Sequence, residues 1–237
     1  MEPAKNSGWT VCIFAFIQAI IRLLPVKGVH LFAEFEPKSG ACLSGGYKWI
    51  SEEMKTYLIP VWKALDPVYF KLSRLTYPSD EELPENIFRV RITKYKGRNV
   101  TLSDGTTINK NDLLIKIHLH NIRLLSEIKD IKSEVTRGRI IFQYVKQSLP
   151  ILENYINNHK KNSEIKGIIG ISMLNRGCQR LGFDVIGISH PLYRRFKRIS
   201  CLMINLLSHS HSSKSSSPSY LFMSKEKLSI MYNKESC

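Results

Sequence analysis

The sequence predicts a mixed α/β fold: a single domain with a small central mixed sheet, a β-hairpin and flanking helices. Three observations support this prediction. Residues 88–92 alternate apolar and polar side chains, which is the period of a strand. The dipeptide Asp104-Gly105 separates two short strand-like segments, as in a tight hairpin. Residues 113–119 form a further strand pattern, and helical periodicity follows it.

Residues 1–57 are expected to precede this domain as a hydrophobic helix and an irregular linker. Trp9–Leu24 is almost entirely apolar, but its sixteen residues are fewer than the roughly 20 that a helix needs to cross a bilayer. We interpret it as a helix that lies on a membrane or docks on the domain, with an uncleaved anchor as the alternative. Residues 25–50 contain several Pro and Gly and keep no period.

The domain is predicted to span residues 58–207. Acidic residues after Ser51 favour the start of a helix. Pro60 is expected to interrupt this helix, and a second one is expected to run to about Leu75. The strand at 88–92 and the hairpin of residues 100–108 follow it.

The segment Asp112–Asn121 has the clearest strand pattern in the chain. Its apolar residues at 113, 115, 117 and 119 share one face, while Lys116, His118 and His120 share the other. A short helix with an apolar face at 122, 125 and 128 comes next, and a longer one spans 134–158 with an apolar face at 141, 145, 149, 152 and 156. Pro150 is expected to kink or split the longer helix.

The second half is predicted to alternate strands and helices. Strands are expected at 165–172 and 183–188, with a helix at 173–181 that Gly182 ends. Pro191 suits the first turn of a last helix reaching Leu207. Residues 208–237 begin with a Ser-rich, low-complexity run, which predicts a flexible tail with at most a frayed helix in its last twenty residues.

Composition favours anionic partners without selecting one. The chain has 237 residues, with 35 Lys and Arg against 20 Asp and Glu, a net charge of +15. Such a charge attracts phosphate backbones, anionic lipids and acidic glycans. The five cysteines are scattered and form no C-x-x-C pair, which favours reduced thiols and a cytoplasmic setting, peripheral to a membrane if the apolar helix binds one.

His118 and His120 are the first candidates for a ligand site. Alternate residues on a strand have Cα atoms roughly 6–7 Å apart on one face. That spacing suits an anion-binding pair, general acid–base chemistry, two metal ligands, or a structural hydrogen-bonded pair. A third metal ligand is missing from the local sequence, so we expect no metal and no cofactor.

Two strand-to-helix junctions supply the remaining candidates, because α/β proteins often bind ligands where a strand ends and a helix begins. Asn121 and Arg123 lie at the first junction, where Asn121 is equally well explained as a helix cap. Asn175, Arg176 and Arg180 lie at the second, where helix packing with solvated arginines is the simpler interpretation.

Other classes of function have weaker support. The strand with Arg89 and Arg91 lacks the interleaved aromatic residues of an RNA-binding sheet, so we do not expect nucleic acid as a partner. The basic amphipathic segment Pro191–Leu207 is expected to close the core, with an anionic membrane as a second partner for it and for Trp9–Leu24. Neither G-x-S-x-G nor H-E-x-x-H occurs, so an enzyme assignment rests on the histidines alone.

Several segments together resemble the YkoP-like domain family of bacterial proteins. These are the segments that begin at Ile87, Leu102, Asp112, Met173 and Pro191, and they cover about 60–207 in collinear order. The family occurs as free-standing proteins and joined to polysaccharide deacetylase domains, so the resemblance implies a link to cell-envelope or glycan metabolism. No deacetylase motif is present here, and that activity is not carried over.

We therefore expect an accessory domain that binds an anionic or glycan ligand in a cell-envelope context. The alternatives are a small hydrolase or transferase that uses a strand histidine as general acid–base, and a basic nucleic-acid-binding module. The sequence indicates no oligomeric state.

Overall fold

The computed structural model describes residues 52–79, 86–131, 133–172, 177–195, 197 and 217–233. Backbone contacts divide the chain into two units, Met1–Met54 and Lys55–Cys237. The described helices and strands belong to the second unit, except that the first helix begins at residues 52–54 of the first unit. Among them, no helix is long and apolar enough to span a membrane. The expected helix at 9–24 lies outside the described residues.

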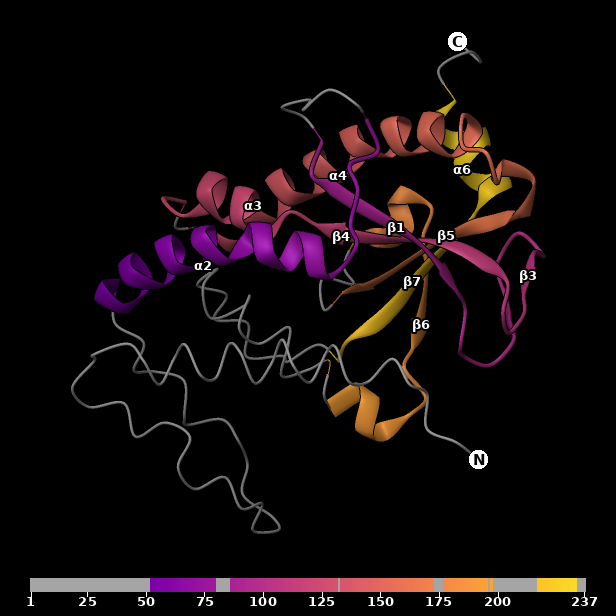
Figure 1. Ribbon diagram of the computed structural model, residues 1–237, viewed down its shortest axis with the longest axis horizontal. Helices are drawn as coiled ribbons and strands as arrows, with labels where there is room; N and C mark the ends of the chain where they lie inside the picture. The colour runs from indigo at the N-terminus through magenta and orange to yellow at the C-terminus, as the bar shows by residue number, and fades with distance from the viewer. Residues whose placement is uncertain are drawn as a thin grey trace. The chain divides into compact units, whose positions relative to one another are not determined.

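A five-stranded mixed sheet forms the centre of the domain (Figure 1). Its strands, in spatial order, are β1 (Phe88–Lys94), β4 (Leu113–Leu119), β5 (Ile165–Ser172), β7 (Ser219–Ser224) and β6 (Asp184–Gly187). β4 and β5 are parallel, and every other neighbouring pair is antiparallel. The predicted mixed α/β fold is confirmed.

The predicted hairpin is also confirmed. β2 (Val100–Thr101) and β3 (Thr107–Ile108) form a separate two-stranded antiparallel sheet. Gly105 lies in the turn with φ of +84°, a conformation that glycine adopts without the steric cost of a side chain. Leu102 and Ile108 from this region are buried against Phe222 of β7.

Three helices cover one face of the sheet: α3 (Asn121–Ile128), α4 (Glu134–Asn157) and α6 (Lys225–Tyr232). Figure 1 shows α4 running along the sheet with α6 beside it. The predicted apolar faces of α3 and α4 are confirmed, because their buried residues lie at the expected spacing. The main core holds these side chains together with the apolar residues of β1, β4, β5 and β7; its fully buried members include Phe88, Ile115, Leu149, Leu152, Ile168, Met223 and Leu228.

The opposite face of the sheet is covered in part by α2 (Glu52–Leu72), whose Tyr69 hydroxyl lies 3.3 Å from Nδ1 of His118. The helical segment 191–195 with Lys197 also contributes, since the Tyr193 ring stacks on that of Tyr220 in β7 at a centroid distance of 6.5 Å. This second face is therefore polar near β1 and β4 and aromatic near β7.

Both predictions of interrupted helices need correction. α2 continues through Pro60 and Pro67 as one helix, so the expected pair of helices is wrong. α4 likewise continues through Pro150, so of the two expected effects of this proline the split is wrong. A proline removes one backbone hydrogen bond, but the turns on either side keep theirs, and tertiary packing of the buried α4 face offsets the loss.

The C-terminal prediction is wrong in its most important part. Residues 219–224 are not tail but form β7, which pairs with β5 on one side and β6 on the other. Residues 225–232 form α6, whose Leu228 is only 1% exposed. The domain therefore extends past the expected limit of 207. The pattern failed because a strand buried on both faces has no polar alternation to reveal it.

The structure describes only part of the two helices that were predicted at 173–181 and 191–207, and it changes the type of the first. The segment Cys178–Leu181 is a single 3-10 turn, η2, and residues 173–176 lie outside the described part. Gly182 ends η2 in a left-handed conformation, as expected for a C-cap. For the expected helix from Pro191, residues 191–195 and 197 are helical, and 198–207 lie outside the description.

Candidate functional site

The register of β1 and β4 gathers basic side chains on the face opposite the main core. Arg89 lies directly across from His118, and Arg91 lies directly across from Lys116. Residues opposite each other in an antiparallel pair project to the same face with Cβ atoms about 4.5–5.5 Å apart. We call Arg91, Lys116 and His118 the basic site.

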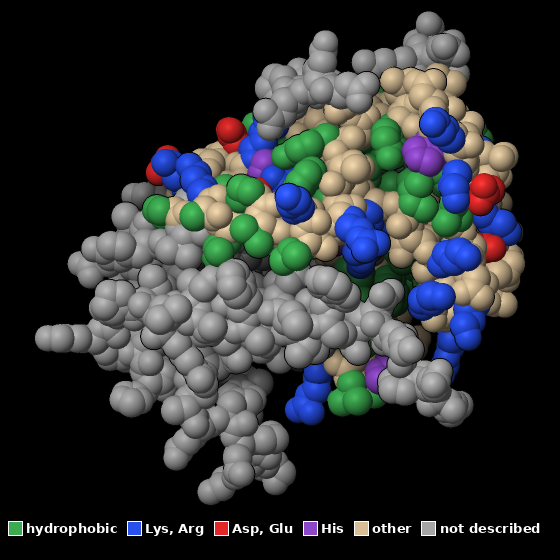
Figure 2. Space-filling model, viewed as in Figure 1, with side chains coloured by type: hydrophobic (Ala, Val, Ile, Leu, Met, Phe, Trp, Pro, Cys, Tyr) green, Lys and Arg blue, Asp and Glu red, His purple; other side chains and the backbone are tan. Residues whose placement is uncertain are grey.

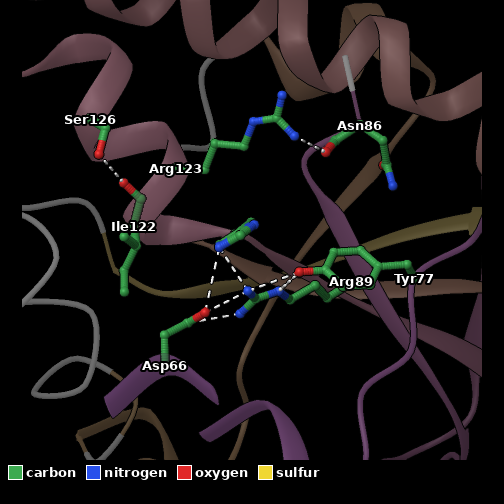
Figure 3. Close-up of polar contacts among 8 residues, drawn as sticks. Asp66, Tyr77, Asn86, Arg89, Ile122, Arg123 and Ser126 are labelled. Carbon is green, nitrogen blue, oxygen red and sulfur yellow. Dashed lines mark hydrogen bonds and ion pairs between the residues drawn. The ribbon is translucent and has the colours of Figure 1, made fainter. Parts of the chain in front are cut away.

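Beside the basic site, Arg89 is fully engaged. Its guanidinium makes a two-pronged ion pair with Asp66 of α2, with nitrogen–oxygen distances of 2.8 and 2.5 Å. It also donates to the Tyr77 hydroxyl at 3.1 Å (Figure 3). The guanidinium stacks over the Phe70 ring at 5.1 Å from its centroid. Only 5% of the Arg89 side chain is exposed, so Asp66 compensates a buried charge.

His120 completes this network from the end of β4. Its Nε2 lies 2.7 Å from a guanidinium nitrogen of Arg89 and 3.5 Å from Asp66 Oδ2. Arginine can only donate, so the shorter contact requires a lone pair on Nε2 and places the ring proton on Nδ1. In this tautomer His120 orients Arg89, while its Nε2 makes no hydrogen bond to the Asp66 carboxylate.

Among the described residues, the basic site has no comparable counter-charge. Arg91 donates to the Ser73 carbonyl at 3.4 Å, but within the described residues no carboxylate forms an ion pair with Arg91 or Lys116. Nε of Arg91 and Nε2 of His118 are both buried and lack a hydrogen-bond partner in the described part of the chain. Nε of Arg91 is always a donor, and Nε2 of His118 is one in the tautomer whose Nδ1 accepts from the Tyr69 hydroxyl. Buried donors without a partner are uncommon in proteins, and they indicate a place for an acceptor.

Electrostatics at the basic site follow from this arrangement. Burial, reinforced by the positive charges of Lys197 and Arg91, lowers the pKa of Lys116 to about 7. Burial also lowers the pKa of His118, and the nearby cations Lys116 and Arg91 add to the effect. A bound anion would offset the part of both shifts that comes from neighbouring cations, while burial, the largest cause, would remain.

The residues predicted from sequence fall in different places. His118 belongs to the basic site, and His120 belongs to the neighbouring Arg89–Asp66 network. Asn121 is the first residue of α3, and His120 rather than Asn121 occupies the N-cap position. Arg123 donates to the Asn86 carbonyl at 3.3 Å, a bond that ties α3 to the start of β1 (Figure 3).

The second predicted cluster is not brought to the histidines. Arg180 is exposed at the end of η2, which contacts β6 at the far edge of the sheet from β1. Three strand spacings of about 4.8 Å separate β6 from β4. Asn175 and Arg176 lie outside the described residues.

Sequence reasoning missed Arg91, Lys116 and Asp66 as site residues. The alternation of β1 and β4 already indicated that Arg91 shares a face with Arg89, and Lys116 with His118. Only the pairing of the two strands brings Arg91 to Lys116. Asp66 lies in a helix 23 residues before Arg89, and no local pattern connects them.

The fold and the site together define a mixed α/β domain with a partly buried basic site on one face of its sheet. The chain belongs to the family of the YkoP domain, whose profile matches residues 55–232. It is similar to the protein named "Uncharacterized protein YkoP" of Bacillus subtilis (strain 168), with 53% identity over 184 residues. The aligned region is 77% of this chain and 100% of that protein. No solved structure matches the chain.

The family match confirms the resemblance to YkoP-like proteins and corrects its extent. The matched region reaches residue 232 and therefore includes β7 and α6, which the expected range of 60–207 left out. These are the elements that the structure places in the sheet and the core.

Proposed function

We propose that this domain binds a small anionic ligand at the basic site, as an accessory module in a cell-envelope context. The observation that carries the proposal is the directly opposed pair Arg91 and Lys116, for which the described residues supply no carboxylate. Two positive groups held side by side away from water repel each other and lose hydration. An anion would relieve both costs.

Hydrogen bonding supports the same ligand class. In the tautomer that accepts from the Tyr69 hydroxyl, His118 presents an N–H at Nε2, the buried atom without a described partner. Nε–H of Arg91 is a second such donor. A carboxylate or phosphate oxygen accepts from both donors, whereas a neutral sugar hydroxyl satisfies the donors without compensating the charge.

The test is stabilisation by anions at constant ionic strength. Inorganic phosphate, glucuronate and neutral chitotriose would each be added to the full chain, with NaCl adjusted to keep ionic strength fixed. At 100 times its dissociation constant a ligand stabilises by about 2.7 kcal/mol, which raises the melting temperature of a chain this size by roughly 5–10 °C. We expect phosphate or glucuronate to do so, and chitotriose to do much less.

A matched pair of variants locates the effect. Arg91→Met removes one cation of the basic site, and Arg139→Met removes an exposed arginine of α4 by the same substitution. The anion-dependent shift should disappear in Arg91→Met and persist in Arg139→Met. Equal shifts in both variants, or shifts no larger than NaCl alone produces, would contradict the proposal.

A general acid–base role for His118 is the second candidate. It is supported by the contact between Nδ1 and the Tyr69 hydroxyl, which fixes the ring, and by the lowered pKa that keeps the ring neutral near pH 7. His118→Gln would retain a donor and remove the base. Anion binding that survives this change supports the binding function over the enzymatic one.

A further inference from the structure

We propose that Lys116 is a reactive amine that forms a Schiff base with a small carbonyl compound carrying an anionic group, such as a 2-oxo acid. This inference rests on the proposed anion site, since the anionic group of the compound would occupy it. It adds a covalent step and a substrate class to a site otherwise assigned to binding.

The position of Lys116 sets it apart from other lysines near the sheet. It is partly buried in the middle of β4, opposite Arg91, with His118 on the same face two residues later. Lys166 of β5 instead pairs with Asp112 at 3.3 Å and is exposed, and Lys227 of α6 lies 3.9 Å from Asp184. No carboxylate in the described residues holds Lys116 in its charged form through an ion pair.

The groups around Lys116 are cationic or neutral, with one exception that is already engaged. Arg89 and Arg91 face it from β1, His118 from β4 and Lys197 from the segment after Pro191. Tyr69 of α2 lies against His118, and the only acidic group of this region among the described residues, Asp66, is bound by both guanidinium nitrogens of Arg89.

These neighbours make Lys116 a nucleophile near neutral pH. Its pKa is lowered to about 7 by burial, Lys197 and Arg91, so about half of the amine is neutral at that pH. An ordinary lysine has a pKa near 10.4 and is neutral in only about one molecule in a thousand at pH 7.4. Lysines that enzymes use for Schiff bases are activated in this way, by desolvation or by an adjacent cation.

The chemistry balances with groups that are present. The Nζ lone pair of Lys116 attacks the carbonyl carbon, and the carbonyl oxygen takes up a proton to give a carbinolamine. Loss of water then leaves a C=N bond, and the two hydrogens of the neutral amine end as the two hydrogens of that water, relayed by a base that is regenerated. His118, kept neutral by its lowered pKa, is the candidate to accept and return the proton at Nε2, in the tautomer whose Nδ1–H donates to the Tyr69 hydroxyl. Arg91 would hold the carboxylate of the 2-oxo acid.

The experiment is reductive trapping on the full chain. The protein is incubated with pyruvate and sodium cyanoborohydride at pH 7.5, and the lysines are mapped by mass spectrometry after proteolysis. The reduced adduct adds the mass of pyruvic acid less one oxygen atom. We expect Lys116 to be labelled at least about tenfold faster than Lys166, on the basis of its larger neutral fraction.

Three comparisons make the result decisive. Lys116→Arg should lose the fast adduct while its circular dichroism spectrum stays that of the wild type. Acetone, which has no anionic group, should give a much smaller ratio of Lys116 to Lys166 labelling than pyruvate. Inorganic phosphate should slow labelling of Lys116 by pyruvate and leave Lys166 unaffected.

Failure of this inference can be told from failure of the binding proposal. If phosphate stabilises the protein through Arg91 but Lys116 is labelled no faster than Lys166, the site binds anions and the covalent step is wrong. If Lys116 is labelled selectively but equally well relative to Lys166 by acetone and pyruvate, the amine is reactive and the anionic substrate class is wrong.

Discussion

Arg89 and Arg91 lie two residues apart on one strand and have opposite electrostatic surroundings. Arg89 is paired with Asp66, donates to Tyr77 and contacts His120. Arg91 faces Lys116, and within the described part of the chain its side chain donates only to the Ser73 backbone carbonyl. A buried charge that has a counter-charge is compatible with a purely structural role. A buried charge without one lowers the stability of the fold unless a ligand supplies the counter-charge. This contrast is the reason to look for function at the second arginine.

The residue-scale prediction concerns the cost of the Lys116 charge. Lys116→Met should stabilise the ligand-free protein at pH 6, by about 1–4 kcal/mol, as found when buried charges are replaced by apolar residues of similar volume. In the unfolded chain the pKa of Lys116 returns to its ordinary value near 10.5, and in the folded chain it is about 7. Below pH 7 both states bind the proton, so the folded state carries the whole cost of the charge.

Between pH 7 and 10.5 the unfolded state still binds the proton that the folded state has lost, so wild-type stability rises with pH. The advantage of Lys116→Met should therefore shrink across that window and vanish above it. Urea unfolding at pH 6, 8 and 10 measures this, with Lys166→Met as the control. An advantage that does not change with pH would show that the charge of Lys116 is not the cause.

At the scale of elements, the C-terminal strand and helix determine whether the sheet is complete. β7 lies between β5 and β6, so β6 joins the sheet only through β7. Gly167 of β5 allows this pairing to be close: a Cβ built there would lie 2.4 Å from the carbonyl oxygen of Met223. Ser224 then starts α6 as its N-cap, accepting from the backbone N–H of Lys227 and donating to Asp104 in the hairpin.

The element-scale prediction uses α6. Leu228 is 1% exposed in the main core, and Ile230 of the same helix is 83% exposed. Leu228→Ala should cost about 2–5 kcal/mol in the free energy of unfolding, because it removes buried methyl groups and leaves a cavity. Ile230→Ala should change it by no more than about 0.5 kcal/mol. Urea denaturation followed by circular dichroism measures both, and equal small effects would mean that α6 is not part of the core.

At the scale of the whole molecule, positive charge dominates the surface. The chain carries a net charge of +15, and Figure 2 shows many Lys and Arg side chains and few Asp or Glu on the visible described surface. Self-repulsion of this size destabilises a compact state, and salt screens it, with a Debye length of about 10 Å at 0.1 M.

The whole-molecule prediction is that NaCl stabilises the protein. Raising NaCl from about 0.05 to about 0.5 M should increase the urea midpoint of unfolding. The positive charges lie closer together in the folded state than in the unfolded chain, so screening relieves more repulsion in the folded state. The exposed residues Lys129 and Lys160 provide the control. Changing both to Glu lowers the net charge by four and should reduce the salt response. A midpoint that falls as salt rises would contradict the prediction.

Local sequence patterns were enough for most of the fold. The alternation in β1 and β4, the Asp104-Gly105 turn and the apolar faces of α3 and α4 depend only on neighbours in the chain, and each was predicted correctly. Pro60 was misleading, because a local rule expects a break where the structure keeps one continuous helix. β7 was missed because both of its faces are buried and a Ser-rich run precedes it.

The candidate site, like the fold, was predictable from local sequence only in part. The sequence by itself determined which side chains share a face of each strand: Arg89 with Arg91, and Lys116 with His118. That follows from the two-residue period of a strand, a property of the local backbone. Only the tertiary structure decided that Arg91 lies opposite Lys116, and that Asp66 neutralises Arg89 and leaves Arg91 without a described counter-charge. Strand register and helix docking are set by burial of the whole core, and so they determine where the charge remains uncompensated.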